Sequence, residues 1–206
     1  QEGGNVRVIG VKGNFDDCQR GVKEAFARLS GEMPEGTALS SANSINIGRL
    51  VPQIAYYFMA YARLCYQGVI EAGERVDFAV PTGNFGDILA GYYAKKLGLP
   101  VGKLLCASNA NNVLTDFLAT GIYDTHRPFR VTTSPSMDIL VSSNLERLLF
   151  DVMDGDAEKL RACMNALGSE GVYRVEELVM ERIRESFAGY DCSDERGARI
   201  IRRLWE

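Results

Sequence analysis

Apolar and polar positions along the chain predict helices that alternate with short strands. Residues 6–11 form a short, β-branched run that predicts a strand. Apolar residues at helical spacing follow from 15 to 29 and predict a helix. Asn14 precedes this helix as a suitable N-cap, with Asp16 and Asp17 favourably placed in the first turn. The chain is thus predicted to open with a strand, a turn and a helix.

A long helix is predicted next. Across residues 47–67 the apolar positions recur every three and four residues, which indicates one long, largely buried helix. Pro52 either lies in its first turn or kinks it.

The following segment has the pattern of a βαβ unit. The strands are predicted at 76–80 and 103–107, with a helix between them at 88–97 that ends near Gly98 and Pro100. Short turns join the three elements, so we expect parallel strands with a right-handed crossover. The predicted fold class is therefore α/β.

Beyond residue 112 the pattern becomes helical, and acidic and small residues interrupt it near Asp154 and Gly155. We therefore predict that 1–153 belong to an α/β domain and that 154–206 are a helical segment. Three strands with helices on one side are too few for a closed α/β core of usual size. Together with the absence of an initiator Met, this leads us to expect a piece of a longer chain.

Composition narrows the function classes. The chain has 206 residues, 46% of them hydrophobic, and a formal net charge of −4, which gives no basic footprint for nucleic acid or anionic lipid. No apolar run approaches the roughly 20 residues of a membrane span, so we expect a soluble protein. Five separated cysteines without a C-x-x-C pair, and a single histidine, favour a reduced cytoplasmic protein without a metal site.

The loop at residues 81–87, Pro-Thr-Gly-Asn-Phe-Gly-Asp, is the first candidate site. It joins a buried strand to a helix start, where free backbone N–H groups and the positive end of the helix dipole can bind a phosphate. Gly83 and Gly86 would give the loop steric freedom. The loop lacks the motifs of P-loop and dinucleotide-binding proteins. A tight βα turn with Asp87 as helix cap explains the same residues.

The second candidate site is the stretch 43–49. Asn43, Ser44, Asn46 and Arg49 could supply convergent donors to a charged oxyanion, and the guanidinium of arginine suits phosphate. The alternative is an Asx-rich turn that caps a helix, with Arg49 solvated. The residues by themselves leave both interpretations open.

Longer motifs carry a resemblance to a known family. The runs AxSSANSINIGRLVPQIAYYF, VDFAVPTGNFGDILAGYYAKKLGLP and SPSMDILVSSNLERLLF, with the opening GNFDDCQ, closely resemble threonine synthase in its longer bacterial and fungal form. The motifs occur in the family's order, and the resemblance extends across nearly the whole chain.

The resemblance implies an enzyme that depends on pyridoxal 5'-phosphate (PLP) and has the tryptophan synthase β-like fold, called fold type II. Its reaction converts O-phospho-L-homoserine and water into L-threonine and phosphate, the last step of threonine biosynthesis. By similarity, the cofactor's phosphate is received by Gly83, Asn84, Phe85, Gly86 and Asp87. The substrate's phosphate, both handle and leaving group, is assigned to Asn43, Ser44 and Arg49, with Asn84 in reach of both phosphates.

The chain departs from the family by what it lacks. The Schiff-base lysine, expected in a Phe-Lys-Asp setting, and a Ser-Gly-Asp-Thr-Gly loop would precede Gln1, and the hydroxyl that faces the pyridine nitrogen would follow Glu206. We therefore expect a central fragment with no catalytic residue and no turnover by itself. Residues 154–206 would be a family-specific insertion. The expected partners are the substrate, the remainder of the parent chain and a possible second copy.

Two other functions are compatible with these loops. One is a threonine synthase-like phospho-lyase or dehydratase, which eliminates without adding water at the β-carbon. The other is a non-catalytic phosphate-binding module.

Several remaining residues are predicted to be structural. We expect His126 at the surface without an acid partner at an interpretable spacing. Met137 and Asp138 are predicted to cap and pack the next helix. A core seam is predicted from four aromatic residues: Tyr56, Tyr57, Phe58 and Tyr61.

Overall fold

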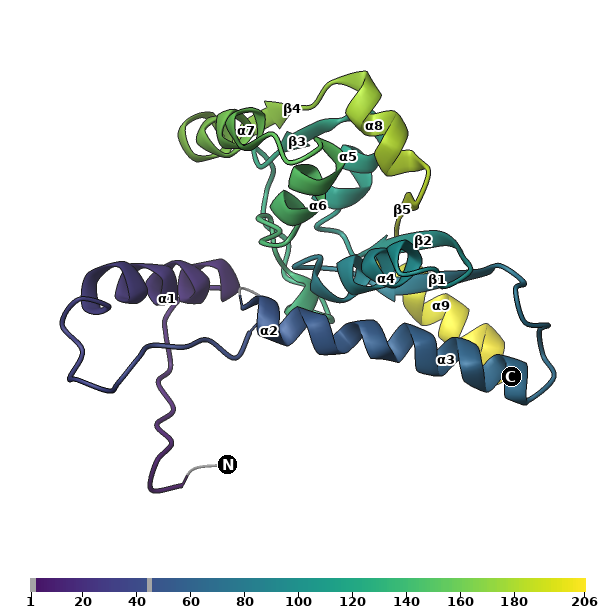
Figure 1. Cartoon of the computed structure of the whole chain (residues 1–206), viewed down its shortest axis with the longest axis horizontal. Coiled ribbons are helices and arrows are strands. Elements are labelled where there is room, and N and C mark those ends of the chain that lie inside the picture. Colours follow the sequence, from purple (N-terminus) through teal and green to yellow (C-terminus); the bar gives the residue numbers. More distant parts are fainter. Residues whose placement is uncertain (1–2, 44–45) are drawn as a thin grey trace. The chain divides into compact units, whose positions relative to one another are not determined.

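The computed structural model describes residues 3–43 and 46–206, apart from the side chain of Phe15. It divides into two compact units, Gln1–Ser40 and Ser41–Glu206. The first contains α1 (Phe15–Leu29) (Figure 1). Asn14 is its N-cap, as predicted: its side chain accepts from the N–H of Asp17 at 3.1 Å, and the Asp17 carboxylate accepts from the N–H of Asn14 at 2.9 Å. This reciprocal pair fixes where the helix begins.

The strand predicted at 6–11 does not form. These residues belong to no sheet, and the side chains of Val8, Ile9 and Val11 are exposed. A β-branched run becomes a strand only when a neighbour satisfies its backbone groups, and the described part of the first unit holds no other strand.

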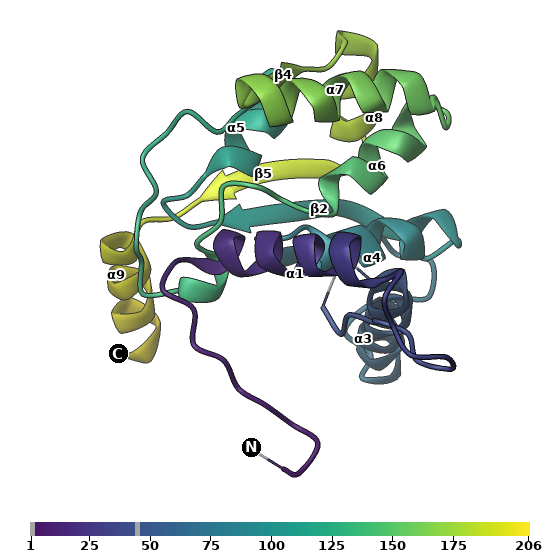
Figure 2. The same ribbon diagram turned by 90° about the vertical axis from the view of Figure 1, so that its left-hand side faces the viewer.

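The second unit is built on a parallel sheet of three strands in the order β1–β2–β5. Strand β1 (Val76–Pro81) pairs with β2 (Val101–Ser108), and α4 (Gly86–Lys96) connects them. The predicted βαβ unit is therefore confirmed. Figure 2 shows β2 and β5 (Phe187–Asp191) side by side, with α9 (Asp194–Trp205) beyond their carboxyl ends.

Strand β5 corrects the prediction that 154–206 are only helical. It pairs with β2 in parallel register, Leu104 opposite Phe187 and Ser108 opposite Asp191. A second, antiparallel pair joins β3 (Ile122–Asp124) to β4 (Val172–Arg174). Residues 41–206 form one compact unit, which contains the boundary expected near Asp154. That the last fifty residues are an insertion of the family stays a prediction.

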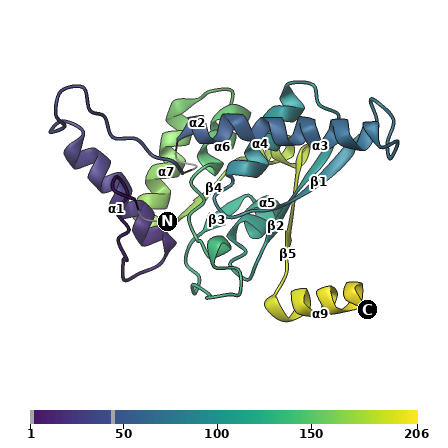
Figure 3. The same ribbon diagram turned by 90° about the horizontal axis from the view of Figure 1, so that it is seen from below.

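The long helix predicted at 47–67 is broken and mostly exposed. It consists of α2 (Ile47–Leu50), a 3-10 turn η1 (Val51–Gln53) around Pro52, and α3 (Ile54–Tyr66). Only three of its side chains are buried: Leu50, Tyr57 and Tyr61. The prediction of a largely buried helix is wrong because only one face of α3 is covered, and α4 packs there (Figure 3).

A glycine allows the close approach of α3 to α4. A Cβ at Gly91 would lie 2.7 Å from the ring of Tyr57 and 2.8 Å from Leu104. No other residue fits there without movement of its neighbours. Tyr57 is thereby held over the first half of α4.

The other helices complete the cover of the sheet and of the β3–β4 pair. The helix predicted to start at 137 begins only at Leu145, after a 3-10 turn η2 (Pro135–Met137). None of the helices in the described ranges has the length and apolar character needed to cross a membrane. The remaining helices are α5 (Val113–Thr120), α6 (Leu145–Val152), α7 (Ala157–Glu170) and α8 (Glu177–Arg184).

Candidate functional site

A cavity of about 610 Å³ lies where the loop after β1 meets α4 and the α2–η1 segment. Both sequence-predicted clusters line it, so the fold joins two loops that are forty residues apart. Of the predicted site residues, Ser44 lies outside the described residues. The others all line the cavity: Asn43, Arg49, Gly83, Asn84, Phe85, Gly86 and Asp87.

The first turn of α4 offers unused backbone donors to this cavity. Its N-cap is Phe85, and no side chain of the described residues caps the helix. The first helical bond is that of Leu89 N–H to Phe85 O at 3.2 Å, and none of the hydrogen bonds between described residues uses the N–H of Gly86, Asp87 or Ile88. The alternative of Asp87 as the cap is therefore wrong. These N–H groups and the helix dipole favour an anion.

The left-handed residue of the loop is Phe85 rather than a glycine. Its φ is 60°, a conformation that costs a bulky residue energy and that its surroundings must enforce. Its side chain is buried, with its ring centroid 5.3 Å from that of Phe187 on β5. At Gly83 φ is not positive, and an added Cβ would meet ordinary contacts at 3.5 Å. The expectation that Gly83 supplies necessary steric freedom is not supported by these contacts.

The segment before α6 holds the carbonyl groups of the loop. The hydroxyl of Ser142 donates to Gly83 O at 2.9 Å. Asn144 donates to Asn84 O twice, from its backbone N–H at 3.1 Å and its side-chain amide at 2.8 Å. Both carbonyls are thus directed toward α6. Sequence reasoning did not assign Ser142 and Asn144, and their place inside the family-like run SPSMDILVSSNLERLLF was the available signal.

Asp87 is held by a tyrosine on α3. The Tyr57 hydroxyl donates to Asp87 O at 2.9 Å and lies 3.3 Å from the carboxylate Oδ1. Burial raises the pKa of the Asp87 carboxyl above its usual value, and the hydrogen bond from Tyr57 opposes that rise. Desolvation, together with Asp87, also raises the pKa of Tyr57. The predicted aromatic core seam holds for Tyr57 and Tyr61, whereas Tyr56 and Phe58 are exposed.

Arg49 supplies the positive charge of the cavity. None of the ion pairs between described residues involves its guanidinium. The turn before it is Asx-capped, since the Asn46 side chain accepts from Gly48 N–H at 2.9 Å and thereby starts α2. The stretch 43–49 therefore contains an Asx turn that caps a helix, and it also contributes residues to the lining of the cavity. Gln53, which sequence reasoning missed, also lines the cavity and donates to Arg49 O at 2.9 Å.

Asp138 does not cap α6, contrary to prediction, but ends the 3-10 turn η2, where its backbone N–H donates to Pro135 O at 3.2 Å. It is buried, and its carboxylate accepts from the amides of Asn109 and Asn111 at 2.7 and 3.0 Å. It also accepts from the N–H and hydroxyl of Thr132 at 2.9 and 2.8 Å. Asp138 therefore fixes the loop after β2 rather than the start of α6, which lies seven residues further on.

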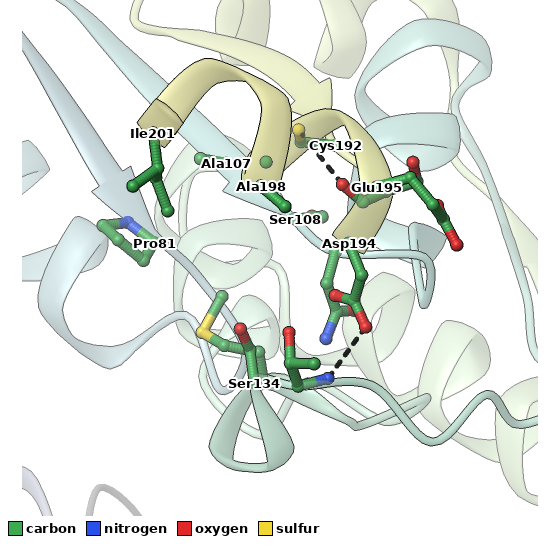
Figure 4. A pocket seen from close by; sticks show the side chains of 14 residues that line it. Pro81, Ala107, Ser108, Ser134, Cys192, Asp194, Glu195, Ala198 and Ile201 are labelled. Atoms are coloured by element: carbon green, nitrogen blue, oxygen red, sulfur yellow. Dashed lines mark hydrogen bonds between the residues drawn. The ribbon is translucent and has the colours of Figure 1, made fainter. Parts of the chain in front are cut away.

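A second cavity, of about 580 Å³, lies beyond the carboxyl ends of the strands, beneath the start of α9 (Figure 4). Pro81 lines both cavities. The Asp194 carboxylate accepts from Thr133 N–H at 2.9 Å and links α9 to the loop before η2. Among the described residues that line it, Asp194 and Glu195 are acidic and none is basic. This cavity is therefore a poor site for an anion, unlike the cavity that contains Arg49.

His126 is exposed, as predicted, but it has an acid partner. Its Nδ1 lies 3.0 Å from Asp124 Oδ1, which also accepts from the backbone N–H of His126 at 2.8 Å. The hydrogen bond from this N–H, with the nearby ring, lowers the pKa of Asp124. The expectation of no acid partner is wrong because the turn at 124–126 brings residues two apart together.

Among known proteins, the chain is similar to threonine synthases and threonine synthase-like proteins. No family model matches the chain. The chain is 46% identical to human threonine synthase-like 1, over 92% of this chain and 26% of that protein. It is 41% identical to threonine synthase of Pseudomonas aeruginosa, over 98% of this chain and 42% of that protein. The chain thus spans between about a quarter and two fifths of these relatives.

Solved structures of threonine synthases also match the chain. A PLP-bound threonine synthase from Brucella melitensis matches with a TM-score of 0.77 and 43% identity, over 90% of this chain and 38% of that one. Threonine synthase from yeast matches with a TM-score of 0.74 and 36% identity, over 89% and 36% respectively. The chain therefore has the α/β fold of type II PLP enzymes. Over nearly its whole length it is similar to threonine synthases and to threonine synthase-like proteins.

Proposed function

We propose that this chain is the phosphate-binding part of a PLP-dependent threonine synthase that converts O-phospho-L-homoserine and water to L-threonine and phosphate. The observation that carries the proposal is the single cavity in which the free N–H groups of α4 lie together with Arg49. Homology to threonine synthases over nearly the whole chain supports it.

The loop fits the phosphate of the cofactor. The N–H groups of Gly86, Asp87 and Ile88 are unused within the described structure, and the helix dipole adds a partial positive charge at the same point. Asn84 and Phe85 line the cavity beside them. We assign the cofactor's phosphate to residues Gly83 to Asp87. When bound, PLP supplies the electron sink for carbanion chemistry.

Arg49 and Asn43 suit the phosphate of the substrate. The guanidinium carries a full charge and a planar fork of donors, which matches a phosphate better than an ammonium would. By holding the departing phosphate, Arg49 orients the γ-carbon and stabilises the charge that develops on the leaving oxygen. Ser44 has the same proposed role. Asn84, which lines the cavity next to the cofactor loop, would contact both groups.

The chain itself is proposed to hold no catalytic lysine. None of its lysines lines this cavity in the described structure. Imine chemistry with PLP requires such a residue. We therefore propose that the chain binds and positions the reactants, while the lysine lies in another part of the parent protein. Five free thiols support a reducing, cytoplasmic location.

Product analysis tests the proposal. The complete protein that carries this chain is supplied with PLP and O-phospho-L-homoserine, and threonine, phosphate and keto acid are quantified together. Equal amounts of threonine and phosphate are expected. An Arg49→Ala variant should raise KM, and Lys159→Ala, on α7 and not among the residues that line the cavity, serves as the control. A folded, PLP-loaded protein that releases no phosphate would refute the proposal.

A second candidate is a phospho-lyase on the same fold. It is kept as a candidate because the chain is 46% identical to proteins named threonine synthase-like 1, a name that does not state which reaction they catalyse. The proposed role of the cavity, to hold the phosphate, is the same in both reactions. The same assay separates them, because a lyase yields phosphate with keto acid and ammonia but no threonine.

A further inference from the structure

We propose that Ser142 and Asn144 are positioning residues, which turn the peptide groups of the loop so that its N–H groups, and not its carbonyls, face the anion. The inference rests on the proposed function, because it explains how the same loop comes to bind phosphate. Both residues precede α6 and lie outside the residues that line the cavity.

The orientation follows from peptide geometry. Every described peptide bond is trans, so the N–H of one residue points opposite to the carbonyl of the residue before it. Ser142 binds the carbonyl of Gly83, which directs the N–H of Asn84 away from α6. Asn144 binds the carbonyl of Asn84 and directs the N–H of Phe85 in the same way.

The orientation of these peptide groups determines whether the loop attracts or repels an anion. A carbonyl oxygen in the cavity would repel a phosphate, whereas successive N–H groups form a concave anion site. Phe85 lies in the left-handed region at the junction with α4, where its conformation must be enforced from outside. Three hydrogen bonds from Ser142 and Asn144 flank this residue on its N-terminal side.

The two positioning residues are themselves fixed. Asn144 is fully buried, and its side-chain oxygen accepts from Arg147. The N–H of Ser142 donates to the Tyr123 hydroxyl at 2.9 Å, and this hydroxyl donates to Leu140 O at 3.0 Å. The segment therefore gives the loop a rigid support.

A further set of contacts keeps α6 aligned with α4. Near the ends of the two helices, the Asp151 carboxylate accepts from Tyr92 and Lys96, each at 2.6 Å. Asn144 and Asn84 join the opposite ends. The two helices therefore run in the same direction with both positive dipole ends near the loop.

The test is a titration of the complete, PLP-free protein that carries this chain with inorganic phosphate, followed by the amide shifts of Asn84 and Phe85 in 15N NMR. Loss of one hydrogen bond is expected to weaken phosphate binding about 5-fold in Ser142→Ala, and loss of the amide about 20-fold in Asn144→Ala. Asn144→Asp should bind more weakly still, because a carboxylate would then face the loop carbonyl. Thermal melts ensure that all variants are compared in the folded state.

Two controls separate positioning from general stability. Val152→Ala loosens the packing of α6 without touching the loop. Ser169→Ala removes a similar hydroxyl bond, to Asn165 O at 2.9 Å, on the distant helix α7. Both should keep the phosphate affinity of the wild type. If the wild type binds phosphate, and Ser142→Ala and Asn144→Ala bind it with the same affinity, the inference is wrong but the proposed function is not affected. A wild-type chain whose loop amides show no saturable shift would contradict the proposed function as well.

Discussion

The Tyr57 hydroxyl donates to the backbone carbonyl of Asp87 at 2.9 Å and thereby connects α3 to the first turn of α4 at the candidate site. The same hydroxyl lies 3.3 Å from the Asp87 carboxylate. The backbone N–H of Asp87 is left for a ligand, while its carbonyl and carboxylate are engaged by the helix behind it.

The first prediction concerns this contact. Tyr57→Phe keeps the buried ring and removes the hydroxyl, so we expect a loss of about 1 kcal/mol in the free energy of unfolding. Urea denaturation measures it. Tyr56→Phe, on an exposed side chain, is the control and should change little. Equal stability of Tyr57→Phe and the wild type would show that the bond contributes nothing.

The second prediction concerns the charge of Asp87. Its folded-state pKa is raised, chiefly by burial, so the unfolded chain loses this proton at lower pH than the folded one. The contribution of Asp87 to stability is therefore present below its unfolded pKa, near 3.9, and declines as pH rises through the raised folded value. Asp87→Asn should remove this decline, which urea melts of both proteins from pH 4 to pH 7 would detect.

Asp87→Asn should also tighten phosphate binding several-fold at neutral pH, because Asp87 lines the cavity and its negative charge repels the anion. Asp191→Asn, a change of the same charge outside the cavity, is the matched control. Weaker phosphate binding by Asp87→Asn would mean that the carboxylate has another role in the site.

The third prediction concerns the packing of α3 on α4. Gly91→Ala places a Cβ 2.7 Å from the Tyr57 ring and should destabilise the fold by about 1–3 kcal/mol, although alanine favours helices. Gly168→Ala, inside α7 with open space around it, should instead stabilise by up to about 1 kcal/mol. Thermal or urea unfolding of both variants distinguishes a packing effect from helix propensity. A gain in stability in Gly91→Ala would contradict the packing described for Tyr57.

The fourth prediction concerns thiol reactivity. Cys106 is fully buried in β2, and burial raises the pKa of its thiol to about 12. At pH 8 only about 10⁻⁴ of such a thiol is ionised, so Cys106 should resist alkylation until the protein unfolds. Cys18 is exposed and serves as the control that reacts first. Peptide mass spectrometry after brief alkylation reads out each site, and rapid labelling of Cys106 would contradict its burial.

The sequence predicted the parts of the fold that local pattern determines. The βαβ unit was predictable because two apolar runs are separated by a helix that ends at Gly98 and Pro100. Strand β5, FAGYD, was not, since a short run with a central glycine becomes a strand only by pairing with β2. The opposite error occurred at residues 6–11, where a good strand sequence has no partner.

The sequence predicted the two loops of the candidate site, but not the backbone conformation and the contacts that shape the cavity. Arg49 and the loop at 83–87 stood out by residue type. The left-handed conformation of Phe85 did not, because glycine is the usual residue there. Ser142 and Asn144 act across about sixty residues of chain, and no local pattern indicates a contact of that separation.

A structure of the complete protein with PLP bound would test the proposed phosphate site most directly. We expect the cofactor's phosphate to accept hydrogen bonds from the N–H groups at the start of α4, with the carbonyls of Gly83 and Asn84 turned toward Ser142 and Asn144. A phosphate bound elsewhere, with the first turn of α4 facing only solvent, would contradict it.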